Sequence, residues 1–380
     1  MKSVGIITYH HYYNYGTMLQ AFALQQVIKD LSYNAEIIDF KQSNDPDILH
    51  LIMIRLRRLP VYLAEREKYK TLAAAKASFD RRNIKYEEFY KKYLHVGKQI
   101  YINSEKLKAD PPEYDAYIVG SDQTWNPYVA NNPEAFYLTF ISDNKKKGSY
   151  APSLGVTQLT QEQKKMFQSR LEGFGFVSCR ESEGAKLLSD IIHRPVANVI
   201  DPTLLLGWNI WSTVSKKSVI SQPYILTYFL GDITEHRIFV HKLASITGLK
   251  VVSIPVSYLD IRVPEFEKVW AGPDEFLSLI RNAEYVCTDS FHGTIFSINF
   301  GVKFYSFCKR KDAEISSDNS RLYSSLKLFG LSDRLITVNN ANKALSRLDI
   351  IDYKEVDRVL NRERERSIKY LETMLNDITQ

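Results

Sequence analysis

Short apolar runs and amphipathic segments alternate along the chain. Residues 4–8 have the length and character of a buried strand, and an apolar helical face follows after a polar loop. That face carries Leu19, Ala23, Leu24, Val27, Ile28 and Leu31. A second apolar run at residues 35–40 completes a βαβ unit, which requires parallel strands joined by a right-handed crossover.

The same alternation continues through the rest of the chain. Further strands are expected at residues 117–120, 148–151, 174–179, 224–229, 250–254, 285–288 and 303–307, with helices between them. The irregular segment after residue 206 places a domain boundary near residue 210. We therefore expect an α/β protein of two Rossmann-like, doubly wound domains, residues 1–210 and 211–350, facing each other across a cleft. The first domain is expected to carry a basic helical insertion at about 48–93, and a C-terminal helix at 351–380 is expected to pack back on it.

Length, charge and cysteine content exclude several classes of protein. A chain of 380 residues is long enough for two hydrophobic cores, and its net charge of +6 comes without the basic stripe of a nucleic-acid binder. Cys179, Cys287 and Cys308 lack CxxC spacing and indicate neither a disulfide framework nor a zinc site. No signal-peptide pattern or bilayer-length apolar run is visible, so a cytoplasmic protein is expected. The basic stretch at 52–58 could touch the inner membrane surface, but an ordinary amphipathic arm explains it better.

Polar motifs stand at the expected carboxyl ends of strands, where parallel sheets bind ligands. In the turn at 289–294, His292 is a candidate general acid or base, and the helix N-terminus that follows favours an anion. A simple helix-capping turn is the alternative. Arg180 ends another strand, and its planar guanidinium suits a carboxylate or phosphate unless it only pairs with Glu181.

The loop at 9–16 is a candidate lining of the cleft, with plain turn chemistry as the alternative. It offers His10, Asn14, Tyr15 and Gly16, but not the spacing of a dinucleotide-binding loop. His10 and His11 are adjacent, and adjacent histidines are not expected to share a metal ion easily. No metal site is therefore expected.

Two more motifs could contribute ligand contacts. The motif at 120–127 offers Asp122, Gln123 and Trp125, and the indole suits either stacking on a sugar ring or filling the domain interface. A late basic group either completes a phosphate pocket or forms a solvated loop. It consists of Lys309, Arg310, Lys311 and Arg321.

In this order and at these distances, the motifs resemble the polysaccharide pyruvyl transferase family. The resemblance spans about residues 4–330, in GIITYHHYYNYGTMLQAFAL, YDAYIVGSDQTWNP, SYAPSLG, SCRESEG, VIDPTLLL, GPDEFLSLIRNAEYVCTDSFHGTIFSI and SDNSRL. It implies a GT-B-like fold with the active site between the domains. It also implies transfer of a pyruvyl group from phosphoenolpyruvate to a saccharide as a ketal, in cell-surface or exopolysaccharide biosynthesis. Phosphoenolpyruvate is then a co-substrate, and no cofactor is expected.

The resemblance also implies roles for individual residues. The family's Arg-x-His motif matches Ser290-Phe291-His292, so His292 is expected to be catalytic, with serine in place of the arginine. Arg180 matches the family's other donor-binding arginine. The expected donor-binding residues are Ser290, Gly293, Thr294, Lys309, Arg310 and Arg321. The expected acceptor-binding residues are His10, Asn14, Tyr15, Gly16, Asp122, Gln123 and Trp125. Phosphoenolpyruvate carries a phosphate and a carboxylate, so its pocket is expected to hold a second cation. Lys309, Arg310 and Arg321 are the candidates, and if none of them reaches the pocket a different donor is expected.

Two alternatives are left open by the sequence. One is a GT-B glycosyltransferase that uses a nucleotide sugar, and the other is a non-catalytic carbohydrate-binding relative, which Ser290 favours. The sequence does not identify the acceptor saccharide or indicate whether it is lipid-linked, and it gives no oligomeric state.

Overall fold

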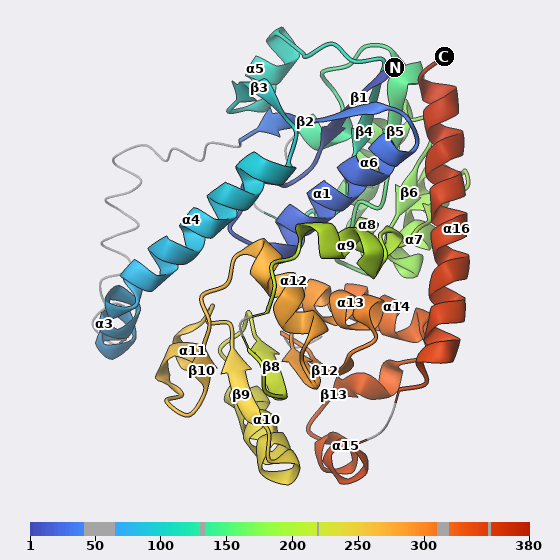
Figure 1. Ribbon diagram of the computed structural model, residues 1–380. Coiled ribbons are helices and arrows are strands. Elements are labelled where there is room, and N and C mark those ends of the chain that lie inside the picture. Colours follow the sequence, from blue (N-terminus) through green and yellow to red (C-terminus); the bar gives the residue numbers. More distant parts are fainter. Residues whose placement is uncertain (42–64, 130–133, 219, 310–318, 349–350) are drawn as a thin grey trace.

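A computed structural model describes residues 1–41, 65–129, 134–218, 220–309, 319–348 and 351–380. The basic stretch at 52–58, Arg310 and Lys311 lie outside the described residues. Two parallel sheets, one in each half of the chain, lie one above the other with helices packed around them (Figure 1). The expected α/β fold of two Rossmann-like domains is confirmed.

The first sheet has five parallel strands in the order β3-β2-β1-β4-β5. These strands are β1 (Ser3–Ile7), β2 (Asn34–Phe40), β3 (Val96–Tyr101), β4 (Ala116–Val119) and β5 (Lys147–Ser149). The helices of this half are α1 (Tyr15–Asp30), α3 (Arg66–Ala74), α4 (Lys76–Tyr93), α5 (Ser104–Ala109), α6 (Gln161–Leu171) and α7 (Ser182–Ile192). Short 3₁₀ helices lie at Glu134–Tyr137 and Asn144–Lys146.

The strand expected at 174–179 is much shorter than the apolar pattern indicates. Only β6 (Ser178–Cys179) is regular, and it pairs with β7 (Ala197–Asn198) in a separate two-stranded sheet. Ser149 and Ser178 explain the break, because their side chains replace backbone ladder bonds. Ser178 N donates to Ser149 Oγ at 2.9 Å, and Ser178 Oγ donates to the Ser149 carbonyl at 2.7 Å.

The second sheet has six parallel strands in the order β10-β9-β8-β11-β12-β13. They are β8 (Tyr224–Tyr228), β9 (Lys250–Ser253), β10 (Glu267–Lys268), β11 (Tyr285–Thr288), β12 (Lys303–Phe307) and β13 (Leu335–Ile336). The helices of this half are α10 (Thr234–Thr247), α11 (Tyr258–Arg262), α12 (Pro273–Arg281), α13 (Phe291–Phe300), α14 (Ser320–Leu328) and α15 (Ala341–Arg347), with a 3₁₀ helix at Ser332–Arg334.

Both sheets reverse their strand order at one point, between β1 and β4 and between β8 and β11. A doubly wound sheet opens a crevice at such a point, outside the carboxyl ends of the strands. The loops that begin at Thr8, Gly120, Phe229 and Asp289 therefore mark where a ligand is expected to bind.

Several helices join the two halves. α8 (Pro202–Leu205) and α9 (Trp208–Val214) form the connection, and α1 packs against α8, α12 and α13. α16 (Tyr353–Ile378) starts beside the second sheet and runs along one side of the molecule to the first (Figure 1). Along this path Arg364 Nε donates to the Leu204 carbonyl at 2.6 Å, and the Tyr370 hydroxyl donates to the Ser149 carbonyl at 3.2 Å.

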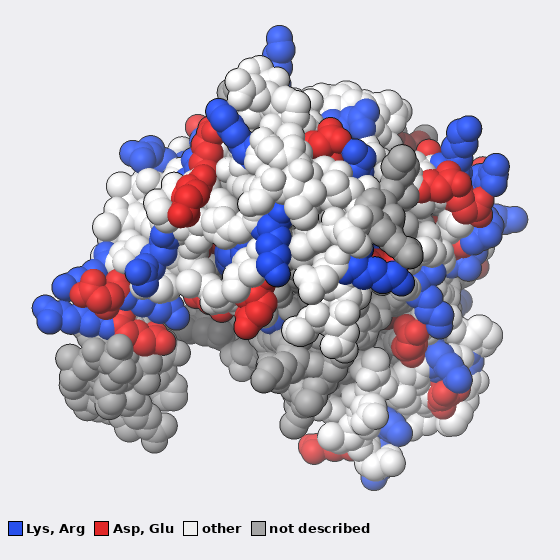
Figure 2. Space-filling view, turned by 90° about the horizontal axis from the view of Figure 1, so that it is seen from below, with Lys and Arg blue, Asp and Glu red and all other residues white. Residues whose placement is uncertain are grey.

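One face of the molecule carries charges of both signs (Figure 2). On the face shown in Figure 2, basic and acidic side chains of the described residues are interspersed. None of the described helices combines the length and the apolar character that crossing a membrane requires.

Candidate functional site

The N-termini of α1 and α13, one from each half of the chain, meet at His292. His292 is the second residue of α13, and Gly16 is the second residue of α1. A Cβ atom added to Gly16 would lie 1.9 Å from Nδ1 of His292, so the imidazole packs directly on the backbone of α1. Gly16 is therefore needed for this close approach, and both halves of the chain build the surroundings of His292.

Asp201 links His292 to Arg180. Its Oδ2 atom lies 2.5 Å from Nη1 of Arg180 and 3.6 Å from Nε2 of His292. Its Oδ1 atom accepts hydrogen bonds from the backbone N and the hydroxyl of Thr203, at 3.0 and 2.7 Å, which orients the carboxylate at the start of α8. All three charged side chains are buried. One carboxylate thus holds the two residues expected to be catalytic.

The electrostatics of this cluster fix two of its charges. Burial raises the pKa of Asp201, but His292, Arg180 and the hydrogen bonds outweigh it and hold that pKa well below its usual range. Burial lowers the pKa of Arg180, but Asp201 and Glu181 outweigh it and raise that pKa. At neutral pH Asp201 is an anion and Arg180 a cation. The carboxylate therefore lies as a fixed negative charge beside the His292 ring.

Several buried nitrogen atoms of this cluster have no hydrogen-bond partner. Nε and Nη2 of Arg180 and Nε2 of His292 are buried without a hydrogen-bond partner. The Arg180 guanidinium lies 4.2 Å from the centre of the Phe291 ring, and that of Arg321 on α14 lies 5.5 Å from it. Two cations thus lie against one aromatic ring, and one of them is the expected donor residue Arg321.

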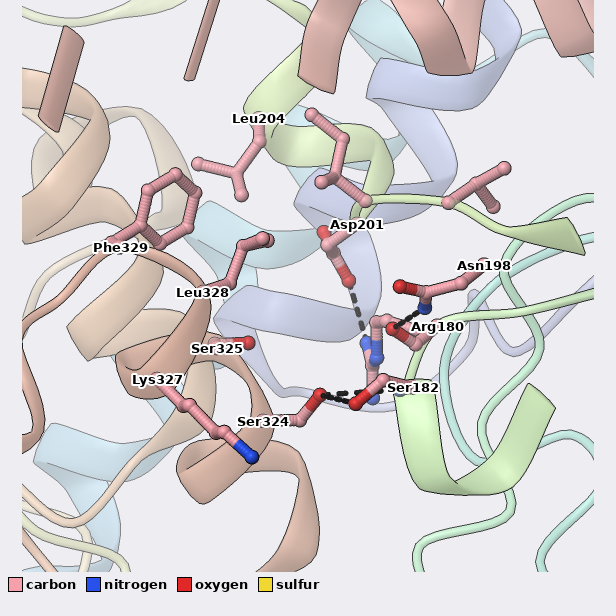
Figure 3. Close-up of a pocket in the computed structure, with 12 residues that line it drawn as sticks. Arg180, Ser182, Asn198, Asp201, Leu204, Ser324, Ser325, Lys327, Leu328 and Phe329 are labelled. Atoms are coloured by element: carbon pink, nitrogen blue, oxygen red, sulfur yellow. Dashed lines mark hydrogen bonds and ion pairs between the residues drawn. The ribbon is translucent and has the colours of Figure 1, made fainter. Parts of the chain in front are cut away.

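A pocket of about 290 Å³ opens beside the Arg180–Asp201 pair. Figure 3 shows Arg180 and Asp201 on one side of it and α14 on the other. Ser182 N bridges the two sides by donating to Ser324 Oγ at 3.2 Å. The lining residues are Arg180, Ser182, Asn198, Val199, Ile200, Asp201, Leu204, Ser324, Ser325, Lys327, Leu328 and Phe329. His292 does not line this pocket and reaches it only through Asp201.

The first residues of the expected acceptor site have local structural roles. Asn14 is the N-cap of α1 and accepts from Thr17 N at 3.2 Å, although it stays partly exposed. Tyr15 is buried between the halves, where it stacks on Phe276 and donates to the Ala271 carbonyl at 2.7 Å. The expectation that Tyr15 contacts the acceptor is wrong, because its whole ring and hydroxyl are used in the interface.

His10 and His11, which were not expected to share a metal ion easily, lie side by side in the structure. Both rings turn toward Asp39 on β2, and their centres lie 3.9 Å apart. The parallel pairing of Ile6 with Ile37 places Asp39 beside the start of the loop that carries both histidines. His10 is fully buried in this cluster and does not line the cleft as expected.

The motif at 120–127 divides into a partly exposed and a buried part. Asp122 and Gln123 stay partly exposed, and Oδ2 of Asp122 accepts from the Thr17 hydroxyl at 2.9 Å. Their acceptor role stays a prediction. Trp125 is fully buried, with its indole N–H donating to the Phe136 carbonyl at 2.9 Å. Both interpretations of Trp125 are wrong, because its ring lies in a core of the first half, where no sugar can stack on it.

Three of the expected donor-binding residues build the start of α13 instead. Ser290 is its N-cap and accepts from Gly293 N at 3.3 Å. A Cβ atom on Gly293 would lie 2.6 Å from the hydroxyl of Thr288, so this glycine allows the helix to pack on its strand. Thr294 is fully buried and shares a 2.7 Å hydrogen bond with Ser306. Direct donor contacts from these side chains are therefore not supported, and the capping alternative describes them better.

Lys309 lies beside a second buried carboxylate. Asp289 accepts from the backbone N atoms of Leu230 and Gly231, at 2.6 and 2.9 Å, and burial raises its pKa to about 6. Lys309 packs against Gly231 and partly offsets this charge. Its donor role stays a prediction, and Arg310 cannot be placed because it lies outside the described residues.

Asp201 is the main residue that the sequence analysis missed as a site residue. It follows the apolar pair Val199-Ile200, at a position where parallel folds bind ligands. A charged residue just after a buried run, held by the following helix, is the signal that could have identified it.

A family model described as polysaccharide pyruvyl transferase matches residues 14–307. No significant match is found among curated proteins. The UDP-GlcNAc 2-epimerase of Neisseria meningitidis, solved with UDP-GlcNAc, is similar in structure with a TM-score of 0.51 at 10% identity, over 98% of that chain and 99% of this one.

Two other solved structures align less closely. The glycotransferase of kitacinnamycin has a TM-score of 0.48 at 10% identity, over 98% of this chain and 97% of that one. A putative UDP-N-acetylglucosamine 2-epimerase from Listeria monocytogenes has a TM-score of 0.45 at 10% identity, over 95% of each chain. At such identities the likeness concerns the fold alone, which is that of GT-B enzymes. The family match covers more than half of the chain and includes Gly16, Arg180, Asp201 and His292, and the protein therefore belongs to the polysaccharide pyruvyl transferase family.

Proposed function

We propose that this protein transfers a pyruvyl group from phosphoenolpyruvate to a saccharide and forms a cyclic ketal. Membership of the family supports the reaction class. The observation that carries the proposal is the buried Arg180–Asp201–His292 cluster where α1 and α13 meet. It combines a cation with unused donors and an imidazole beside a fixed carboxylate.

Arg180 is the proposed anchor of the donor. Its Nε and Nη2 atoms have no hydrogen-bond partner, and a guanidinium matches the geometry of a carboxylate or phosphate. Arg321 supplies the second cation, since it approaches the same Phe291 ring. Together the two arginines balance the negative charge of phosphoenolpyruvate, because Ser290 stands where the family has another arginine.

His292 is the proposed proton-transfer residue. A proton is added to the methylene carbon of phosphoenolpyruvate, and a saccharide hydroxyl attacks the neighbouring carbon and loses its own proton. A second hydroxyl of the saccharide then displaces inorganic phosphate from that carbon and closes the ketal. His292 passes these protons, and Asp201 lies 3.6 Å from its Nε2 atom and holds the ring in place. Asp122 and Gln123, which stay partly exposed, are the proposed acceptor contacts.

Donor binding is tested by thermal unfolding with phosphoenolpyruvate. A ligand that binds only the folded protein raises its Tm with concentration. We expect this rise in the wild type and its loss in Arg180→Gln and Arg321→Gln. Arg358→Gln is the matched control, because Arg358 is exposed on α16 and pairs only with Glu355 among the residues described. Since Arg180→Gln leaves Asp201 buried without its cation, the ligand-induced rise is compared and not the Tm itself.

Turnover is tested by phosphate release from phosphoenolpyruvate with a panel of saccharides, lipid-linked and soluble. Release that His292→Gln abolishes is the expected result. A Tm rise with uridine or guanosine diphosphate sugars and none with phosphoenolpyruvate would instead favour glycosyl transfer. Saccharide binding without phosphate release from any donor would favour a non-catalytic relative.

A further inference from the structure

Three potential metal ligands converge at the carboxyl ends of β1 and β2. They are His10, His11 and Asp39, and one ligand atom from each lies within 4.8 Å of the others. The parallel register that pairs Ile6 with Ile37 brings Asp39 level with the start of the loop that carries both histidines. No other group of this kind occurs in the part of the chain that the structure describes.

The orientation of His10 is that of a metal ligand. Its Nδ1 atom lies 2.8 Å from the Thr8 carbonyl, which can only accept, so Nδ1 carries the proton and Nε2 carries the lone pair. Nε2 is buried without a hydrogen-bond partner and lies 3.6 Å from Oδ1 of Asp39. A backbone carbonyl that fixes the tautomer in this way is the usual outer partner of a metal-binding histidine.

His11 and Asp39 complete the set from the partly open side. Nε2 of His11 lies 2.5 Å from Oδ1 of Asp39, and its side chain is 19% exposed, against 0% for His10. Burial lowers the pKa of His11 to about 4, although Asp39 opposes this. Burial raises the pKa of Asp39, but the two imidazoles outweigh it and hold that pKa below its usual range. The three side chains therefore offer two imidazole nitrogens and one carboxylate oxygen to the same point.

We propose that His10, His11 and Asp39 bind one divalent transition-metal ion, with zinc as the best match. Imidazole with carboxylate suits zinc. Magnesium and calcium prefer oxygen ligands alone and therefore fit this set poorly. Zinc bound at about 2.0–2.1 Å places tetrahedral ligands about 3.4 Å apart, close to the 3.6 Å between His10 and Asp39. The shorter distance between His11 and Asp39 is that of a hydrogen bond. Metal binding would replace this hydrogen bond after the Asp39 carboxylate rotates. The fourth position, on the side of His11, is left for water or another oxygen ligand.

The proposed metal would fix the loop that leads to the candidate active site. The loop begins at Thr8 beside the three ligands and ends at Gly16 against His292. Gln20 already ties its backbone, because its amide donates to the Tyr9 and Thr17 carbonyls at 3.0 and 3.1 Å. The metal proposal rests on this geometry and not on the proposed transfer reaction.

Metal binding is tested on the full chain, after removal of bound metal with a chelator, by titration with Zn²⁺ against a chromophoric competitor. We expect one equivalent to bind, and His11→Ala and Asp39→Asn to weaken the affinity by about 100-fold or more. His95→Ala is the matched control, because His95 forms an exposed pair with Glu36 at 3.4 Å on the same sheet. Asp39→Asn is nearly isosteric, and circular dichroism checks that each variant is folded.

Co²⁺ substitution adds a readout that needs no donor or acceptor. A four-coordinate site gives intense visible absorption bands, which both ligand variants are expected to lose and His95→Ala to keep. No stoichiometric Zn²⁺ binding in the wild type, or binding equally strong in all three variants, would overturn the metal site. Neither result bears on phosphoenolpyruvate binding at Arg180, which is measured separately.

Discussion

Replacing Gly16 with alanine tests how His292 is positioned. The added Cβ atom would lie 1.9 Å from Nδ1, 2.4 Å from Cγ and 2.6 Å from Cε1 of His292. Each distance is far below an ordinary contact, so the ring has to move by about 1.5 Å. It cannot do so freely, because His292 is buried between the two halves of the chain.

The magnitudes for stability and catalysis differ. Alanine is favoured over glycine in a helix by up to about 1 kcal/mol, whereas overpacking costs about 1–3 kcal/mol. We therefore expect a net destabilisation of at most about 3 kcal/mol and a folded variant. Catalysis should suffer more, since a misplacement of about 1 Å can cost about 100-fold in rate.

The assay compares phosphate release from phosphoenolpyruvate and the Tm for Gly16→Ala and Gly175→Ala. Gly175 is exposed, and its added Cβ atom would meet nothing closer than 3.9 Å, so this control should leave both quantities nearly unchanged. Wild-type turnover in Gly16→Ala, with His292→Gln inactive, would refute the idea that Gly16 sets the ring position. Wild-type turnover in both Gly16→Ala and His292→Gln would refute the catalytic role of His292.

Three further predictions concern stability. Asp201→Ala leaves Arg180 buried without its carboxylate and should cost about 3–5 kcal/mol in urea unfolding; a loss below about 1 kcal/mol would contradict a coupled pair. Burial lowers the pKa of His236 to about 4. The contribution of the neutral ring to the free energy of unfolding is therefore fully present above the unfolded pKa near 6.5 and is lost as the pH falls toward 4. Between pH 7 and pH 4.5 the wild type should therefore lose about 2 kcal/mol more than His236→Phe, and an equal loss would disprove the assignment. Ser290→Ala removes the cap of α13 and should cost about 1 kcal/mol, measured by thermal unfolding beside the wild type; an unchanged Tm would mean that the cap is not used.

Local patterns in the sequence determined the elements and the edges at which the site lies. Apolar runs of strand length and helical faces define both sheets, and the polar residues after β1, β4 and β11 do stand at the switch points. The capping alternative for the turn at 289–294 also follows from sequence, because a serine accepts from the helix N-terminus wherever the helix lies. These features depend on neighbours within a few residues.

Tertiary structure alone decided which side chains meet. Trp125 and Tyr15 looked like ligand contacts, but an aromatic ring with a polar tip serves equally well in a core or an interface. Asp201 lies 21 residues from Arg180 in sequence and contacts it only because two separate segments end at one edge. His10 and Asp39 likewise meet through the register of β1 and β2. Such pairings depend on how strands align and helices cross, and a local pattern of polar and apolar residues carries no information on those non-local distances.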